Sequence, residues 1–279
     1  MHPYVILDVF ADTPLNGNQL AVFTQGDEVP GRLMQKTARE LNLSETVFVL
    51  AADGDADKRI RIFTPLAELP FAGHPTLGSA FVVGEELDVA AVRLATGSGV
   101  VPVSLRWEDG QIVYGEMEQP IPEVVPFDHA QELFDALGVS GSALPVEAYT
   151  NGPTFVYVTL ASEAEVVALE PDMRGLRKLG AVGVMCLGGH GSYYKARMFG
   201  PGLGVDEDPA TGSAAGPLAL HLARHGRIEW GQEVTISQGE EIGRPSVLNA
   251  RVLGSSERVE KVLVGGRAVL VARGEYRLQ

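Results

Sequence analysis

The stretch DEDPATGSAAG (206–216) joins three carboxylates to a run of very small residues. Small residues let a ligand approach the backbone closely, and the N–H groups at a helix start attract anions. An apolar helical pattern begins at Gly212, where Thr211 or Ser213 could cap the helix. The pattern suits a site for a substrate carboxylate, although small residues also serve plain capping and tight packing.

The stretch GHPTLGS (73–79) opens a second apolar helix in a similar way. His74 is a candidate cap there, with Pro75 at the first helical position. The run lacks the lysine of a phosphate loop, and GPGLG (200–204) lacks the spacing of a dinucleotide fingerprint. In the later helix, Pro217 would be tolerated only within the first turn.

The two helix starts occupy matching places in two halves of the chain. Four segments recur in the same order at offsets of 135–139 residues: NGNQLAVF with NGPTFVYV, TVFVL with GVMCL, RIFTP with RMFGP, and AGHPTLGSA with TGSAAGPLA. In each half, strands outnumber a few apolar helices. We therefore predict an α+β fold of two similar domains, each a curled, barrel-like sheet around one central helix.

A proline-rich segment, 119–130, predicts the boundary between the halves. The predicted domains are 1–118 and 122–279, and the last strand either stays in the second domain or returns to the first. If a pseudo-two-fold axis relates the halves, the two helix starts face each other across a cleft. Such a cleft would suit a small substrate that carries a carboxylate.

A further carboxylate, Glu45, stands where a helix gives way to the apolar run TVFVL. Partial desolvation there would raise its pKa and make it an acid and base near neutral pH, although an exposed helix-end glutamate has the same sequence context. The matching position near Val182 carries no acid, so the scaffold itself does not require one. Asp208 is either a capping or a solvated acid by local sequence, and Asp206 and Glu207 are expected to be solvated.

The composition disfavours several classes of partner and cofactor. The chain has 279 residues and a net charge of −14, which disfavours nucleic acid and anionic membranes as partners. Cys186 is the single cysteine, and no acidic or histidine cluster with ligand spacing accompanies the 206–208 carboxylates, so we expect no disulfide and no metal. No apolar run reaches membrane-spanning length and the start does not resemble a signal peptide, so a cytoplasmic protein is expected.

The segments NGNQLAVF, LSETVFVL, RIFTPLAELPFAGHPTLGSA and RMFGPGLGVDEDPATGSAAGPLAL resemble the signature segments of the PhzF family, the phenazine-biosynthesis isomerase and its relatives. The resemblance implies a diaminopimelate epimerase-like fold, a homodimer, and proton transfer without cofactor or metal. It implies that Glu45 is the general acid/base that moves a proton between ring carbons of a dihydro-hydroxyanthranilate. It further implies that His74 and Asp208 assist, and that the substrate carboxylate is bound by Gly73, Gly212 and Ser213.

The epimerase branch of this fold uses a cysteine at each helix start as opposed acid and base. Neither helix start carries a cysteine here, which excludes a two-thiol racemase and leaves a one-base mechanism open. We therefore predict an isomerase of a small, carboxylate-bearing, cyclic substrate. The alternatives are a non-catalytic binding protein on the same scaffold and another enzyme, such as an epimerase or lyase without cysteine bases or a hydrolase, for which no nucleophile motif is present.

Overall fold

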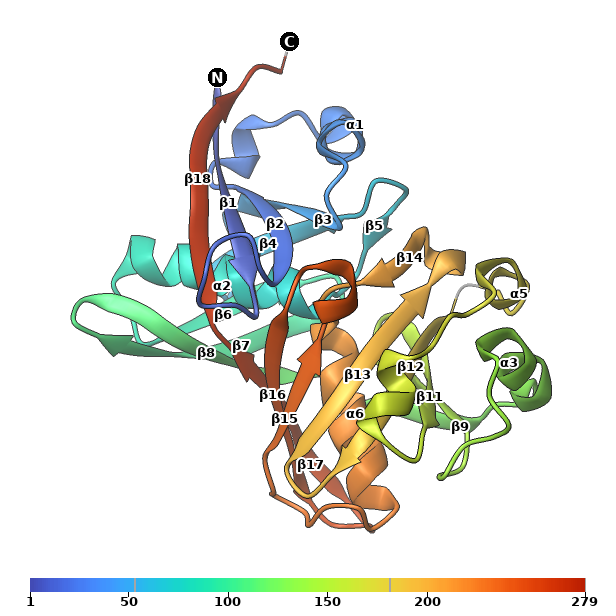
Figure 1. Ribbon diagram of the computed structural model, residues 1–279. Coiled ribbons are helices and arrows are strands. Elements are labelled where there is room, and N and C mark those ends of the chain that lie inside the picture. Colours follow the sequence, from blue (N-terminus) through green and yellow to red (C-terminus); the bar gives the residue numbers. More distant parts are fainter. Residues whose placement is uncertain (53, 181, 279) are drawn as a thin grey trace. The chain divides into compact units, whose positions relative to one another are not determined.

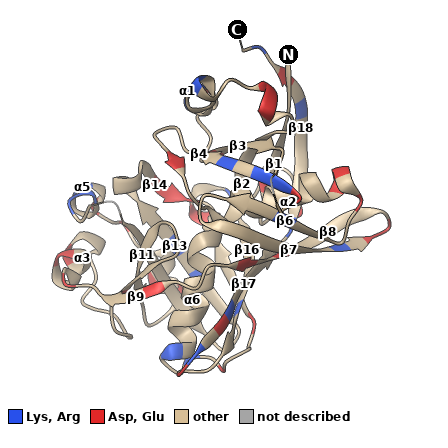
Figure 2. Cartoon of the chain, turned by 180° about the vertical axis from the view of Figure 1, so that it is seen from behind, with Lys and Arg blue, Asp and Glu red and all other residues tan. Residues whose placement is uncertain are grey.

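The computed structural model describes residues 1–52, 54–180 and 182–278 (Figure 1). The chain divides into two compact units. Unit 1 comprises Met1–Pro120 together with Gly265–Gln279, and unit 2 comprises Ile121–Val264. Acidic and basic residues are scattered along the elements of both units (Figure 2). Among the described residues, none of the helices combines the length and the apolar character needed to cross a membrane.

Unit 1 contains one sheet with the strand order β18-β1-β2-β3-β4-β6-β7-β8. The β2–β3 and β4–β6 pairs are parallel and the others antiparallel, with β5 added beside β4. In Figure 1 the red strand β18 runs beside the blue strand β1. The strands are β1 (His2–Val9), β2 (Asn18–Phe23), β3 (Glu45–Leu50), β4 (Lys58–Phe63), β5 (Glu68–Leu69), β6 (Ala91–Thr96), β7 (Gly99–Glu108), β8 (Gln111–Gln119) and β18 (Ala268–Tyr276). The helices are η1 (Gly26–Glu28), α1 (Gly31–Leu41) and α2 (Gly73–Leu87).

Unit 2 contains a sheet with the order β9-β10-β11-β12-β13-β15-β16, with β14 added beside β13. Its strands are β9 (Glu123–Pro126), β10 (Glu147–Thr150), β11 (Thr154–Thr159), β12 (Gly183–His190), β13 (Tyr193–Gly200), β14 (Val205–Asp208), β15 (Val234–Gln238) and β16 (Ser246–Gly254), followed by β17 (Val259–Gly266). The helices are α3 (Ala130–Leu137), α4 (Glu163–Val167), α5 (Met173–Arg177), η2 (Pro201–Leu203), α6 (Gly212–Arg224) and η3 (Glu240–Ile242).

The pairings confirm the predicted internal duplication. The parallel pair β2–β3 corresponds to β11–β12, the antiparallel pair β3–β4 to β12–β13, and the parallel pair β4–β6 to β13–β15. The strand beside β1 is β18, and β9 takes the same place beside β10. The sheet of unit 1 is thus completed by β18, from the end of the chain. The sheet of unit 2 is completed by β9, which follows directly after the first half of the chain.

Each unit buries one apolar helix. In unit 1, α2 contacts β1 to β4 and β6 to β8, which shows that the sheet curls around it. In unit 2, every residue of α6 from Gly212 to Ala223 is buried, and the helix packs against β11 and β16. A helix that is apolar on all sides needs such surroundings. At Gly78 of α2 an added Cβ would stand within 3 Å of the Leu20 and Val9 side chains, so a small residue allows the close approach.

The helix starts differ from the predicted caps. Helix α2 begins at Gly73, so His74 is its second residue and not its cap, and Pro75 is its third. The N-cap is Ala72, which makes no side-chain capping bond. Thr211 does occupy the N-cap position of α6, yet its side chain does not cap the helix either.

The sequence predicted that Pro217 lies in the first turn of its helix. This prediction is wrong, because Pro217 lies in the second turn of α6. A proline there has no N–H to donate to the carbonyl four residues earlier, which belongs to Ser213. The side-chain amide of Asn151 replaces that donor, with Nδ2 at 3.0 Å from the Ser213 carbonyl. The Tyr157 hydroxyl donates to the next carbonyl, that of Ala214, at 2.7 Å. These two side chains explain how the helix tolerates an interior proline.

Candidate active site

In unit 1 the structure brings Glu45 and His74 together. Glu45 is the first residue of β3 and His74 the second residue of α2. The Glu45 Oε2 atom lies 3.3 Å from His74 Nε2, and the two side chains are 15% and 5% exposed. Gly73 immediately precedes His74 and is buried, so its backbone lies in the same turn. A carboxyl and an imidazole in contact, largely shielded from water, can hold and pass a proton.

Burial determines the charge of His74. It lowers the pKa of the His74 imidazole to about 3, although a hydrogen bond to the backbone of Gln19 opposes this shift. The ring is therefore neutral near pH 7, and its contact with Glu45 is not an ion pair there despite the short distance. Because the ring donates its one proton to the Gln19 backbone, Nε2 faces Glu45 as an acceptor. A hydrogen bond between the two side chains then requires a proton on Glu45.

Acidification should destabilise the protein through His74. The folded pKa of about 3 lies below the ordinary value of 6.5, so between these values the unfolded chain binds a proton that the folded chain does not. Stability therefore falls as the pH falls, by about 2 kcal/mol for this group between pH 6.5 and 4.5. The variant His74→Asn has no titrating ring and should show a correspondingly flatter dependence.

Urea unfolding of both proteins at pH 6.5 and 4.5 measures this difference. Burial also lowers the pKa of His221, but that residue is present in both proteins, so its contribution cancels. The same pH dependence in both proteins would show that His74 is not held neutral in the fold.

In unit 2 the structure brings Asp208, Thr211, Gly212 and Ser213 into one turn between β14 and α6. Asp208 ends β14 and is 8% exposed. The Thr211 hydroxyl donates to Asp208 Oδ2 at 2.6 Å, which is why it does not cap the helix. Gly212 and Ser213 are the first two residues of α6 and are buried. Their predicted role in binding a carboxylate, like that of Gly73, stays a prediction.

Gln238 fixes this turn and was not predicted. Its Nε2 donates to the Asp208 carbonyl at 2.8 Å and to Thr211 Oγ1 at 3.0 Å, and its Oε1 accepts from the Thr211 N–H at 3.2 Å. Gln238 is 1% exposed, so water does not compete for these bonds. The Thr211 hydroxyl accepts from the Gln238 amide and donates to the Asp208 carboxylate, so both contacts fix its direction. The only signal in the sequence is a glutamine at the end of the alternating stretch VTISQ (234–238).

Glu207 is not solvated, so that part of the prediction is wrong. Arg197 Nε and Nη2 donate to its two carboxylate oxygens at 2.8 Å each, and both side chains are about one-tenth exposed. Arg197 Nη1 also donates to the Leu169 carbonyl at 2.7 Å. Asp206, in contrast, is 66% exposed and pairs with the exposed Arg177 at 3.3 Å. The bidentate pair anchors β14 one residue before Asp208.

The duplicated fold, with His74 at the start of α2 and Gly212 and Ser213 at the start of α6, agrees with what comparison with known proteins finds. The sequence matches the family described as phenazine biosynthesis-like protein over residues 7–274, and the chain belongs to that family. It is 51% identical to the trans-2,3-dihydro-3-hydroxyanthranilate isomerase of Pseudomonas aeruginosa, with 100% of both chains covered. It is 48% identical to the isomerase of the same name from Pseudomonas fluorescens, over 98% of this chain and 99% of that one.

A solved structure supports the fold. The PhzF-family phenazine biosynthesis protein of Bacillus anthracis superimposes with a TM-score of 0.86 at 24% identity, covering 99% of both chains. Since relatives of about half identity over the full length are isomerases, the chain is an isomerase and its substrate is a small molecule.

Proposed function

We propose that the chain isomerises trans-2,3-dihydro-3-hydroxyanthranilate by moving a proton between two ring carbons. The observation that carries the proposal is the contact between Glu45 and a neutral, buried His74 in a chain about half identical to two isomerases of that substrate. A single carboxyl suffices for such a shift because the proton leaves and returns through the same group.

In the proposed mechanism Glu45 acts first as a base and then as an acid. Its carboxylate removes a proton from one ring carbon, and the electron pair left behind delocalises as the double bond shifts. The protonated Glu45 then delivers the proton to another ring carbon, so the product has the formula of the substrate. Between the two steps, Nε2 of the neutral His74 accepts a hydrogen bond from protonated Glu45 and stabilises that form.

We assign the residues of unit 2 to substrate binding. Asp208, oriented by the Thr211 hydroxyl, is proposed to accept hydrogen bonds from the ring amino or hydroxyl group. The backbone N–H groups of Gly212 and Ser213 are proposed to bind the substrate carboxylate, because helix starts favour anions and small side chains leave the backbone accessible. The negative charge that spreads over the ring in the intermediate would be stabilised by the same donors.

The proposal is tested by incubating the purified protein with trans-2,3-dihydro-3-hydroxyanthranilate and following the product by absorbance and mass. We expect turnover to a product of unchanged mass, and much slower turnover of the analogue that lacks the ring carboxylate. The Pseudomonas aeruginosa isomerase, assayed in parallel, controls for substrate quality. Absence of turnover by a folded sample, while that enzyme reacts, would contradict the proposal.

A further inference from the structure

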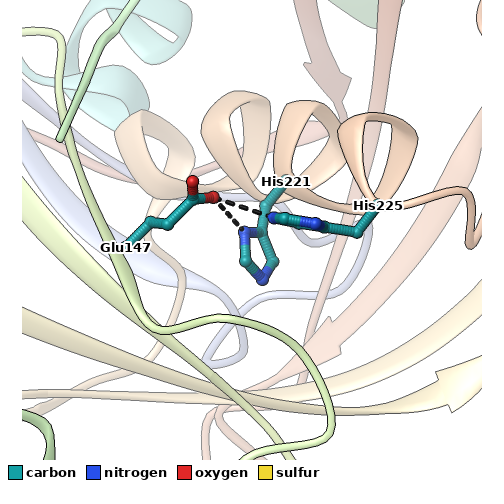
Figure 3. Close-up of side chains that lie close together, drawn as sticks. All are labelled: Glu147, His221 and His225. Carbon is teal, nitrogen blue, oxygen red and sulfur yellow. Dashed lines mark hydrogen bonds and ion pairs between the residues drawn. The ribbon is translucent and has the colours of Figure 1, made fainter. Parts of the chain in front are cut away.

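A histidine–glutamate cluster lies in unit 2 at the end of α6 opposite to Gly212 and Ser213. His221 and His225 stand one helical turn apart, and Glu147 reaches them from the start of β10 (Figure 3). Figure 3 shows both imidazole rings directed at one carboxylate oxygen of Glu147. Glu147 Oε2 lies 3.4 Å from His221 Nδ1 and 2.9 Å from His225 Nε2, and the three atoms lie within 4.8 Å of one another.

We propose that Glu147, His221 and His225 form a binding site for a divalent transition-metal ion, best suited to zinc. Two imidazole nitrogens and one carboxylate oxygen are ligands that zinc takes, with a fourth position left for water. Bonds of about 2.0–2.2 Å in a tetrahedral site place ligand atoms about 3.4 Å apart. The Glu147–His221 separation already has this value, and the Glu147–His225 separation needs to widen by about half an ångström.

The contacts of the cluster converge on one carboxylate oxygen. The Tyr149 hydroxyl and His225 Nε2 each lie 2.9 Å from Glu147 Oε2, and His221 Nδ1 lies 3.4 Å from it. The fold therefore already gathers two imidazole nitrogens and a carboxylate oxygen, and an ion that binds there displaces the protons that these atoms share.

Other groups around the cluster moderate the affinity. Arg224 Nη2 lies 3.2 Å from Glu147 Oε1 and repels a cation, and the Tyr149 hydroxyl contacts both Glu147 Oε2 and His221 Nδ1. When Nδ1 of His221 binds an ion, the ring proton sits on Nε2, which has no hydrogen-bond partner among the described residues. We therefore expect a dissociation constant in the micromolar range and not the much tighter binding of a four-ligand structural site.

The position of the cluster points to a stabilising ion. His221 follows Gly212 by nine residues of one helix, a distance of about 13 Å at 1.5 Å per residue. An ion there would join α6 to β10, away from the turn proposed to bind substrate. Zinc should therefore raise the melting temperature, and removal of zinc should leave isomerisation unchanged.

The test titrates Zn²⁺ alone into chelator-treated protein in competition with a chromophoric chelator, and repeats the titration with Co²⁺ to record its absorption. We expect one ion per chain, a zinc-dependent rise in melting temperature, and the intense visible bands of low-coordinate cobalt. His225→Ala and Glu147→Gln should each weaken binding at least tenfold. His190→Ala, which removes an exposed histidine of the same unit, is the matched control and should bind as the unaltered protein does.

Arg224→Gln should strengthen zinc binding, whereas the ligand variants weaken it. It removes a positive charge from beside Glu147 and adds no ligand, so zinc binding should tighten several-fold. His221→Ala is avoided because His221 is fully buried and its loss would leave a cavity. The proposal is overturned if the unaltered protein shows no saturable binding, if His225→Ala binds as His190→Ala does, or if Arg224→Gln weakens binding. These readouts are independent of the proposed isomerase reaction.

Discussion

Replacing Glu45 by glutamine should lower the turnover of trans-2,3-dihydro-3-hydroxyanthranilate by about 10²- to 10⁴-fold, the usual contribution of a general acid–base group. Glutamine keeps the shape of the side chain but cannot take up and release a proton at working pH. The fold should persist, because glutamine fills the same volume at the start of β3. Steady-state rates, with calorimetry for binding of the product, measure the effect.

The matched control is Glu40→Gln, which changes an exposed glutamate of α1 in the same unit. That variant should retain full turnover. A loss of less than about tenfold in Glu45→Gln would be too small for a general acid–base group. Another group would then move the proton.

Arg197→Met should lower the free energy of unfolding by about 3–5 kcal/mol, because removing one member of a buried ion pair leaves an uncompensated charge. The charge left behind belongs to Glu207, whose side chain is 10% exposed. The substitution also removes the donor to the Leu169 carbonyl. Urea denaturation measures the loss.

The exposed pair between Arg177 of α5 and Asp206 of β14, the residue before Glu207, provides the control. Arg177→Met breaks the contact with Asp206, where both side chains are more than half exposed, and should cost about 1 kcal/mol or less. The double variant Arg197→Met with Glu207→Leu should recover much of the stability lost by Arg197→Met alone. The stabilising role of the buried pair would be contradicted by equal losses of unfolding free energy in the two single variants. A double variant less stable than Arg197→Met would contradict it as well.

The fold was predictable because its signals are repeated and local. The matching segments around Asn16 and Asn151, and around Gly73 and Gly212, indicate two similar halves, and the pairings confirm them. The apolar character of both helices also predicts their burial inside the sheets. Separate features of the sequence point to Glu45 and to His74, and the structure places the two side chains in contact.

What the sequence did not predict depends on contacts between distant segments. Thr211 is a good capping residue by type, but Gln238, 27 residues later, directs its hydroxyl to Asp208. Glu207 looks like part of an acidic turn until the β13–β14 pairing brings it beside Arg197.

The histidine cluster had a local signal of its own. HLARH (221–225) places two histidines at i and i+4 on one helical face, which is a spacing suited to metal ligands. Its third member, Glu147, lies 74 residues before His221, so only the fold completes the cluster. The expectation of no metal rested on the carboxylates at 206–208, which are elsewhere in unit 2.

Proton NMR of trans-2,3-dihydro-3-hydroxyanthranilate in D₂O, with the unaltered protein and with Glu45→Gln side by side, tests most directly whether Glu45 moves the proton. We expect the unaltered protein to convert the ring C–H resonances of the substrate into those of the isomer. In the same period Glu45→Gln should leave them unchanged, with neither product nor loss of a ring C–H signal to deuterium. Product formation or deuterium exchange by Glu45→Gln at a rate near that of the unaltered protein would show that another group moves the proton.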